Sequence, residues 1–266
     1  MIKTEMSILL AYLLTGALAG VIAGLLGVGG GLVIVPALLY LFILQKLPAE
    51  ILMHMAVATS LATIVFTSIS STLAHHRRGA VLWQQVRLFI PGIVVGGLLG
   101  AAIADHLASE SLRITFGVVE ILVAVQIGFD IKPSAHRELP GSSGMFFAGG
   151  GIGALSTLLG IGGGTLTVPF LLWCNVNIRN AIATSSASGL PIAVVGAIAM
   201  VIAGWDAENL PAGSTGYVYW PAATVIIIAS VLCAPLGARL THTLPIKALK
   251  RIFAIVLACV GTRMLI

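Results

Sequence analysis

Charge is scarce in this sequence. Only 9% of its 266 residues are Asp, Glu, Lys or Arg, whereas a soluble globular domain contains roughly 25%. Hydrophobic residues make up 58% of the chain, and several uncharged apolar runs are about 20 residues long, the length that a helix needs to cross a hydrocarbon core of about 30 Å. The sequence therefore excludes an ordinary water-soluble domain and predicts a polytopic protein embedded in a lipid bilayer.

Cysteine is also rare. The three cysteines lie in or beside apolar segments, form no CxxC pair and have no histidine at ligand spacing: Cys174, Cys233 and Cys259. These absences argue against a disulfide framework and against a zinc site. We interpret the cysteines as buried free thiols and expect neither a metal nor any other cofactor.

Enzymatic groups are missing from the apolar segments. An enzyme working inside the membrane would need a nucleophile with a base, or a set of metal ligands. All six histidines lie near helix ends or in loops: His54, His75, His76, His106, His136 and His242. We therefore expect no catalytic residues. The net charge of +5 does not indicate a nucleic-acid partner, because the basic residues sit in short loops and form no stripe with interleaved aromatics.

The long apolar runs predict an all-α fold. In lipid every backbone N–H and C=O group must be paired within the protein, which helices achieve alone. Strands of a membrane barrel would instead alternate apolar and polar residues over about 10 positions. The apolar runs of this chain are longer and do not alternate, so we expect helices throughout.

The chain is an internal duplication. Gly27-Val28-Gly29-Gly30-Gly31, with Pro36 five residues on, reappears as Gly160-Ile161-Gly162-Gly163-Gly164 with Pro169 at the same spacing. Three further anchors follow in the same order in both halves: the Ala-Thr-Ser segments at 56–60 and 181–185, Pro91 and Pro221, and Leu-Gly-Ala at 99–101 and 236–238. We predict a first membrane repeat at residues 1–131, a linker at 132–144 and a second repeat at 145–266.

Each repeat reads as a glycine-broken helical hairpin followed by three longer helices. The hairpins cover residues 8–44 and 145–173, and the longer helices fall near 53–73, 86–104, 112–129, 181–203, 217–240 and 249–266. The second arm of each hairpin, 32–44 and 165–173, is too short to span the core comfortably at 1.5 Å per residue. We expect short or re-entrant arms at these two places.

The distribution of positive charge predicts the orientation. If each hairpin enters and leaves on one face, ten basic residues lie on one side, Arg77, Arg78, Arg87, Lys132, Arg137, Arg179, Arg239, Lys247, Lys250 and Arg251, and four on the other, Lys3, Lys46, Arg113 and Arg263. Cytoplasmic loops are enriched in Lys and Arg. Each repeat then crosses an odd number of times, so the repeats are inverted, and we expect both termini outside the cytoplasm of an inner-membrane protein.

The two glycine runs predict an anion site. Glycine lets a ligand approach the backbone closely, and the helix that starts after each run presents unpaired N–H groups and a positive dipole end. Interrupted helices at matching positions of inverted repeats commonly hold a transported substrate near the midplane. The alternative is that the glycines only allow close helix packing. We expect the substrate to be bound by these residues and by nearby hydroxyl groups: Gly29, Gly30, Gly31, Gly162, Gly163, Gly164, Thr59, Ser60, Thr184, Ser185 and Ser186.

The doubled glycine motif carries a resemblance. Gly-x-Gly-Gly-Gly followed five residues later by Pro, in both halves and accompanied by the Ala-Thr-Ser segment, resembles the TauE/SafE sulfite-exporter family over nearly the whole chain. The resemblance implies secondary transport of small sulfur-containing anions such as sulfite, sulfonates or thiosulfate, often coupled to protons. Family members differ in substrate and direction, so the resemblance does not choose among them.

Three further polar residues are candidates for transport. Glu120 is a carboxylate in the middle of an apolar segment, where an ionised side chain would cost about 2.5 to 3.5 kcal/mol. We therefore expect its carboxyl group to be neutral, paired or facing a cavity. We predict that it carries the coupled proton; the alternative is a structural carboxyl that is hydrogen-bonded to a neighbouring hydroxyl or amide. Arg179, which is equivalent to His54, gates anions or anchors its helix at the interface. Asn175 is expected to line the cytoplasmic mouth. A passive anion channel stays open as the alternative function, because half-helix dipoles also build selective pores.

Overall fold

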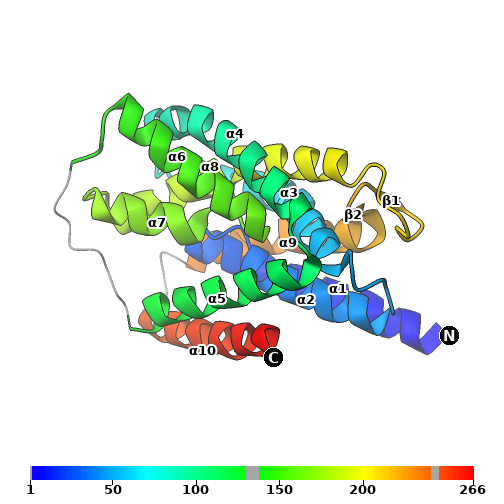
Figure 1. Cartoon of the computed structure of the whole chain (residues 1–266). Helices are drawn as coiled ribbons and strands as arrows, with labels where there is room; N and C mark the ends of the chain where they lie inside the picture. The colour runs from blue at the N-terminus through cyan, green and yellow to red at the C-terminus, as the bar shows by residue number, and fades with distance from the viewer. Residues whose placement is uncertain (1, 130–137, 241–245) are drawn as a thin grey trace.

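The computed structural model describes residues 2–129, 138–240 and 246–266, and it leaves the side chains of 2–5 and 246–252 undescribed. Nearly all of the described chain is helical (Figure 1). The helices of the first half are α1 (Ile2–Leu26), α2 (Gly31–Leu44), α3 (Leu52–His76), α4 (Trp83–His106) and α5 (Ser109–Gly128). Those of the second half are α6 (Ser142–Leu159), α7 (Gly164–Trp173), α8 (Ile178–Ala203), α9 (Trp220–Leu240) and α10 (Ile246–Leu265).

These bounds confirm the all-α, polytopic prediction. Seven helices of the described chain, α1, α3, α4, α5, α6, α8 and α9, are long and apolar enough to cross a membrane. One small element was not expected: a two-stranded antiparallel ribbon, β1 (Ser214–Thr215) and β2 (Val218–Tyr219), joins α8 to α9. Gly216 makes its tight turn with a φ of +52°, a backbone conformation that glycine adopts without strain. The predicted linker, 132–144, lies partly outside the described residues, and α6 begins within it.

The second arm of each hairpin is short, as expected. The Gln45 side chain, just after α2, donates a hydrogen bond to the Tyr12 hydroxyl in the first half of α1 (2.7 Å), so the two arms begin and end on the same side. At 1.5 Å per residue the 14 residues of α2 and the 10 of α7 span about 21 and 15 Å, less than the hydrocarbon core. Each hairpin therefore enters the protein, bends at its glycines and returns.

Rows of glycines allow helices of one half to pack closely against helices of the other half. Gly16, Gly20 and Gly24 of α1 lie against the backbone of α9, and Gly92, Gly96 and Gly100 of α4 lie against the backbone of α6. A side chain at any of these positions would overlap a carbonyl group of the neighbouring helix. Small residues at this spacing allow helices to approach closely in membranes. These glycines thus serve close helix packing. The pairs α1/α9 and α4/α6 are reciprocal, because α1 corresponds to α6 and α4 to α9 in the two halves, and two antiparallel copies of one unit can form such pairs.

The helix contacts also correct one predicted anchor of the repeat. Gly237 of α9 packs on Val21 of α1, and Gly100 of α4 packs on Ala154 of α6, so the two Leu-Gly-Ala segments occupy equivalent places. Pro91, however, lies nine residues into α4, whereas Pro221 is the second residue of α9. Pairing the two prolines was therefore wrong: they lie at different heights in their helices.

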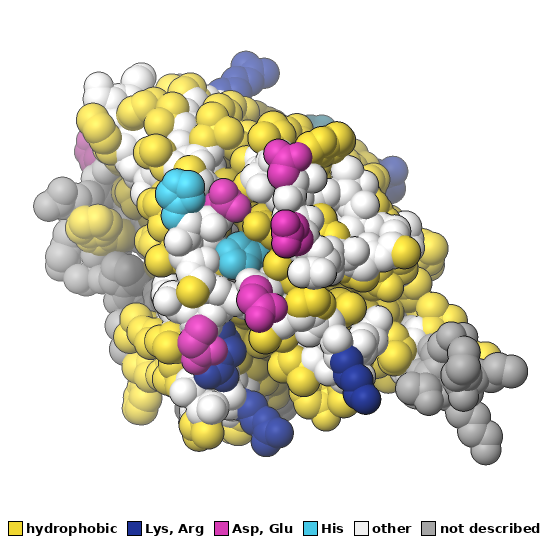
Figure 2. Space-filling model, turned by 45° about the vertical axis from the view of Figure 1, so that its right-hand side comes forward, with side chains coloured by type: hydrophobic (Ala, Val, Ile, Leu, Met, Phe, Trp, Pro, Cys, Tyr) yellow, Lys and Arg dark blue, Asp and Glu magenta, His cyan; other side chains and the backbone are white. Residues whose placement is uncertain are grey.

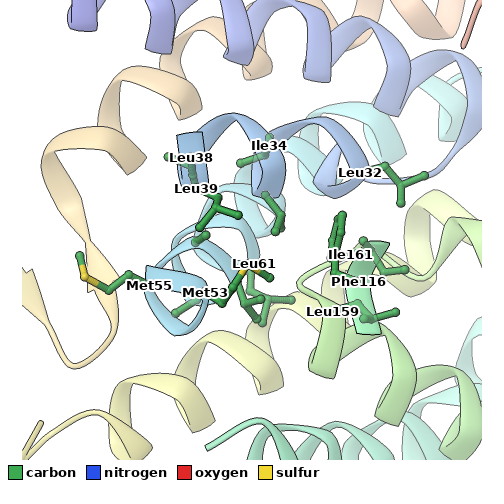
Figure 3. Close-up of a cluster of buried hydrophobic side chains, with 14 of the residues drawn as sticks. Leu32, Ile34, Leu38, Leu39, Met53, Met55, Leu61, Phe116, Leu159 and Ile161 are labelled. Carbon is green, nitrogen blue, oxygen red and sulfur yellow. The ribbon is translucent and has the colours of Figure 1, made fainter. Parts of the chain in front are cut away.

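The apolar core lies beside the first half-helix. Side chains of α2, α3 and α5 meet those of the second glycine bend, and Figure 3 shows Leu32 and Leu38 of α2, Leu61 of α3, Phe116 of α5 and Ile161 in this cluster. All five are almost completely buried. The packed cluster fixes the start of α2 in place, and a fixed start is what a binding site built on that helix end would require.

Charges divide between the two ends of the helices. One end, which we call the acidic face, carries the ribbon, the first turns of α5 and the last turns of α4 and α8. Its charged residues are Glu50, Asp105, Glu110, Asp206 and Glu208, with Lys46, Arg113 and Arg263. Figure 2 looks toward this side. The basic face holds Arg77, Arg78, Arg87, Arg179 and Arg239, with Glu138. The Arg78 guanidinium donates to the carbonyl oxygen of Ala238, which places the α3–α4 loop beside the end of α9.

Candidate functional site

The two glycine bends meet each other. A Cβ atom built on Gly29 would lie 2.7 Å from the Cα atom of Gly162, and one built on Gly162 would lie equally close to the Cα atom of Gly29. Both bends use left-handed backbone at matching positions, with φ of +70° and +68° at Gly27 and Gly160. The bends are thus in direct backbone contact, as predicted for a shared site, and they touch rather than enclose an open space between these two glycines.

Each bend ends as a helix N-terminus. Gly30 and Gly163 cap α2 and α7 with left-handed φ values of +83° and +75°, and neither helix start receives a side-chain cap. The α7 ladder begins with the N–H groups of Leu166 (3.0 Å) and Thr167 (2.7 Å), which both donate to the carbonyl oxygen of Gly163. The first N–H groups of both helices therefore have no partner within the helix, and the positive dipole ends of α2 and α7 lie close together inside the protein.

Two serines connect each bend to the other half. The hydroxyl of Ser60 on α3 donates to the carbonyl oxygen of Gly160 (2.8 Å), and that of Ser185 on α8 donates to the carbonyl oxygen of Gly27 (3.0 Å). Both serines are fully buried. The structure brings these two predicted residues to the bends, but their protons are used to hold the bends in place.

The predicted residues Thr59, Thr184 and Ser186 also form hydrogen bonds within the protein. Thr59 accepts the N–H of Tyr219 (3.0 Å), and Thr184 accepts the N–H of Leu82 (3.1 Å), so each holds the segment that leads into α9 or α4. Ser186 donates to the carbonyl of Ile182 and accepts from Ser71. All three hydroxyl groups already have partners. Their direct binding to substrate remains a prediction.

The sequence analysis missed a second set of hydroxyl residues, around the second bend. Ser156 on α6, Thr165 and Thr167 on α7 and Ser68 on α3 are buried, and their hydroxyl oxygens have no hydrogen-bond partner among the described residues. A signal existed in the repeat. With the spacing of the glycine motifs, Ser156, Thr165 and Thr167 correspond to Ala23, Leu32 and Ile34 in the first half, so only the second half has hydroxyls there.

Arg179 and Asn175 lie away from the bends. Asn175 follows the last turn of α7, and Arg179 is the second residue of α8; both side chains are exposed on the basic face. The ten residues of α7 separate Asn175 from Gly163 by about 15 Å of helix. The structure therefore places these two residues on the basic face and does not bring them together with the glycines.

Glu120 lies beside a cavity. This cavity of about 640 Å³ lies between α2, α5 and α10, with Leu32 and Pro36 in one wall and Val260 in another. Glu120 is among the residues around this cavity, but its side chain is 0% exposed, and both carboxylate oxygens are buried and have no hydrogen-bond partner among the described residues. Arg113 and Arg263 line the same cavity, toward the acidic face. The Glu120 carboxyl is thus enclosed beside the cavity and unpaired among the described residues, and its role as a proton carrier stays a prediction.

His54 belongs to a structural contact on the acidic face. Its Nε2 atom lies 3.0 Å from the carbonyl oxygens of both Ala104 and Leu107, and its ring lies against that of Tyr217. The Tyr217 hydroxyl donates to Asp105 (3.3 Å). Burial first, and then the Asp105 carboxylate, raise the pKa of the Tyr217 phenol above its usual range. These contacts join α3 and α4 to the ribbon.

No group of three or more His, Cys, Asp or Glu side chains that could hold a metal ion occurs within residues 2–129, 138–240 and 246–266. What the site does contain is a set of hydrogen-bond donors at two helix starts, surrounded by apolar side chains. Such a set is suited to an anion that accepts hydrogen bonds.

Comparisons with known proteins agree with this chemistry. The family model described as Sulfite exporter TauE/SafE matches residues 12–264. A probable membrane transporter protein of Haemophilus influenzae is 38% identical over 96% of this chain and 97% of its own length. The probable membrane transporter protein YunE of Bacillus subtilis is 29% identical over 94% of each chain, and MJ0441 of Methanocaldococcus jannaschii is 26% identical over 100% of this chain and 99% of its own. No solved structure matches the chain.

Proposed function

The chain belongs to the TauE/SafE sulfite-exporter family, and we propose that it is a secondary transporter that moves a small sulfur-containing oxyanion, such as sulfite, a sulfonate or thiosulfate, across the inner membrane. Family and relatives make it a membrane transporter rather than an enzyme. The substrate, the coupling to protons and the orientation are the parts that we propose here.

The observation that carries the proposal is the meeting of two half-helix starts. The N-termini of α2 and α7 converge where Gly29 touches Gly162, inside a protein whose surrounding helices are apolar. Partial positive charge at both ends favours a negative ligand, and oxyanions have several oxygens that accept from backbone N–H groups. Broken helices at the interface of two repeats are the usual place of a transported substrate.

Direct contact of the bends also bears on how transport would work. The substrate cannot sit between Gly29 and Gly162 while they touch, so we infer that the bends are the closed point between the two sides of the membrane. Access from either face then requires the halves to move against each other, as in alternating access. The reciprocal bonds of Ser60 and Ser185 tie each bend to α3 or α8 of the other half, so each bend would move together with that helix.

Proton coupling is proposed for Glu120. A carboxyl group that is enclosed in the membrane region and lacks a partner is costly when ionised, and in transporters such groups commonly serve as proton carriers. Glu120 lies beside the cavity on the acidic side, and a small movement that exposes its buried carboxyl would let a proton reach it from that side without crossing the bends. Protonation and anion binding would then be linked through α2, which contributes Leu32 and Pro36 to the same cavity.

We further propose that the basic face is cytoplasmic and the acidic face is not. Cytoplasmic loops carry an excess of Lys and Arg, and the described residues of the basic face include five arginines, Arg77, Arg78, Arg87, Arg179 and Arg239. The first turns of α1 and the last turns of α10 lie toward the acidic face. This orientation puts both termini outside the cytoplasm.

Flux measurements in proteoliposomes test the function. Purified protein should move radiolabelled sulfite or thiosulfate with saturation, accelerated exchange when unlabelled anion is on the other side, and dependence on a pH gradient. A passive channel, the alternative, would follow voltage and show no accelerated exchange. The absence of flux for sulfite, thiosulfate, taurine and sulfoacetate alike would contradict the proposal.

A further inference from the structure

We propose that the second bend alone supplies the side-chain hydroxyls of the substrate site: a small oxyanion binds at the start of α7, held by the free N–H groups of its first turn and by the hydroxyls of Ser156, Thr165 and Thr167. The inference rests on the proposed function and assigns its binding groups. It differs from the symmetric cage of Thr59, Ser60, Thr184 and Ser185 that the sequence suggests.

Two of these hydroxyls point toward the same place. A Cβ built on Gly163, the residue that caps α7, would lie 3.5 Å from the hydroxyl oxygen of Thr167 and 3.6 Å from that of Ser156. The two oxygens therefore flank the helix start from α7 and from α6. Because residue 163 is glycine, the space beside its backbone is kept free of its own side chain, and the free N–H groups of Gly164 and Thr165 are the next donors along the chain.

Burial makes the missing partners significant. Ser156 is 0% exposed, Thr167 is 1% and Thr165 is 6%, and none of their hydroxyl oxygens has a partner among the described residues. Buried polar groups are normally hydrogen-bonded, and one left without a partner lowers stability. A hydroxyl on a helix can usually satisfy itself on the carbonyl four residues earlier, as Ser188 does on Thr184. These three do not, which leaves their protons available for a ligand.

The first bend has no hydroxyl side chains at the corresponding positions. The residues that correspond to Ser156, Thr165 and Thr167 are Ala23, Leu32 and Ile34, and Leu32 and Ile34 are packed into the apolar core shown in Figure 3. The backbones of the two bends share left-handed conformations at Gly27 and Gly160 and at Gly30 and Gly163, whereas their side chains differ. A ligand that needs hydroxyl donors is therefore bound by the second bend, and the first bend contributes its backbone and dipole.

The donor set defines the ligand class. Hydroxyl and N–H donors at a positive helix end select a compact anionic group with several acceptor oxygens, such as the –SO₃ group of sulfite, thiosulfate or a sulfonate. The methyl group of Ile192 lies where a Cβ on Gly163 would be and fills part of this space in the structure, so the Ile192 side chain has to turn away for the anion to enter. The site thus takes the head group of the anion and leaves no room there for a bulky substituent.

Near-isosteric variants test the inference. Thr165→Val and Thr167→Val remove the hydroxyl and keep the shape, and Ser156→Ala removes the third. The matched control is Thr63→Val, at a fully buried threonine whose hydroxyl donates to the carbonyl of Ser60 in its own helix (2.7 Å). Each protein is assayed for thiosulfate and sulfite flux in proteoliposomes, and for thermal unfolding in detergent with and without thiosulfate.

Thr167→Val should raise the KM for thiosulfate by about tenfold or more, the loss expected for one hydrogen bond to a charged group. Without ligand its unfolding temperature should be equal to or above that of the unmodified protein, because an unsatisfied buried hydroxyl has been removed. Thr63→Val should keep its KM. An unchanged KM and thiosulfate-induced shift in all three hydroxyl variants would overturn the inference, as would a lowered unfolding temperature with unchanged KM, which marks a structural role.

The two proposals fail in different ways. If the unmodified protein moves none of the probe anions, the proposed function is wrong. If it moves thiosulfate and the three hydroxyl variants move it with unchanged KM, the function stands and the assignment of binding groups to the second bend is wrong.

Discussion

The backbones of Gly29 and Gly162 are in direct contact, and each glycine occupies the space that a side chain on the other would need. The residues are 133 positions apart, the same offset that separates the two glycine motifs. A single contact therefore joins equivalent points of the two repeats. A contact of this kind tolerates no added atoms on either side, because neither backbone can retreat without breaking the bonds of Ser60 and Ser185.

Gly162→Ala should destabilise the protein and stop transport. Its backbone lies outside the left-handed region, so the substitution adds no left-handed backbone strain, and its effect comes from the overlap with Gly29 and the carbonyl oxygen of Val28. Overpacking of this kind costs about 1–3 kcal/mol. The control is Gly151→Ala, at an exposed helical glycine with no neighbour within 4 Å, where alanine should stabilise the helix by up to about 1 kcal/mol. Thermal unfolding in detergent and flux in proteoliposomes measure both; equal behaviour of the two variants would contradict the backbone contact.

Ser60→Ala and Ser185→Ala should have matching effects. Each removes one buried hydrogen bond to a carbonyl of the opposite bend, with an expected loss of stability of about 1–3 kcal/mol because the carbonyl is left unsatisfied. Thermal unfolding of the two single variants and of the double variant reports the effects. Since the two serines hold different bends, losses that differ strongly from each other would show that the halves do not mirror each other at these points.

Glu120→Gln should abolish the dependence of transport on a pH gradient and leave the fold intact, because glutamine keeps the shape of the neutral carboxyl group. Glu110→Gln on the same helix is the matched control; its exposed ion pair with Arg113 (2.7 Å) contributes little to stability. Flux is measured in proteoliposomes with and without an imposed pH gradient. Persistence of proton-driven flux in the Glu120 variant would remove this residue as the carrier.

Glu208→Cys should react with a membrane-impermeant maleimide in intact cells, whereas Glu138→Cys should react only after lysis. Both glutamates are exposed, on the acidic and the basic face respectively, and positively charged faces are cytoplasmic. The background protein carries alanine at Cys174, Cys233 and Cys259. The opposite labelling pattern would reverse the orientation and place both termini inside.

Much of the fold could be predicted from the sequence because the signals are local. The break at Gly27 to Gly31 and its copy at Gly160 to Gly164 set the ends of four helices, and the predicted start of α7 at Thr165 differs from the observed one by a single residue. The wrong pairing of Pro91 with Pro221 shows the limit. A single proline found in both halves does not establish which residues of the two halves correspond. The Leu-Gly-Ala segments do establish it, because Gly100 and Gly237 both have to face the backbone of a neighbouring helix.

The site was predicted only in part, because hydrogen-bond partners are a property of the tertiary structure. Ser60 and Gly160 are 100 residues apart, and Thr59 and Tyr219 are 160 apart. Nothing in the residue types distinguishes these engaged hydroxyls from those of Ser156 and Thr167. In the same way, the sequence placed Asn175 close after the second half-helix, and only the direction of α7 shows that this is the far end from the glycines.

The sequence by itself determined that this protein lies in a membrane, is helical and is built twice from one unit with a broken hairpin, because composition, run length and repetition are readable without knowing any contact. The tertiary structure alone decided which hydroxyls have hydrogen-bond partners, that Glu120 is buried beside a cavity, and that the two bends touch. Those facts depend on which segments meet across a hundred or more residues, where the low dielectric of the interior makes each unpaired polar group count.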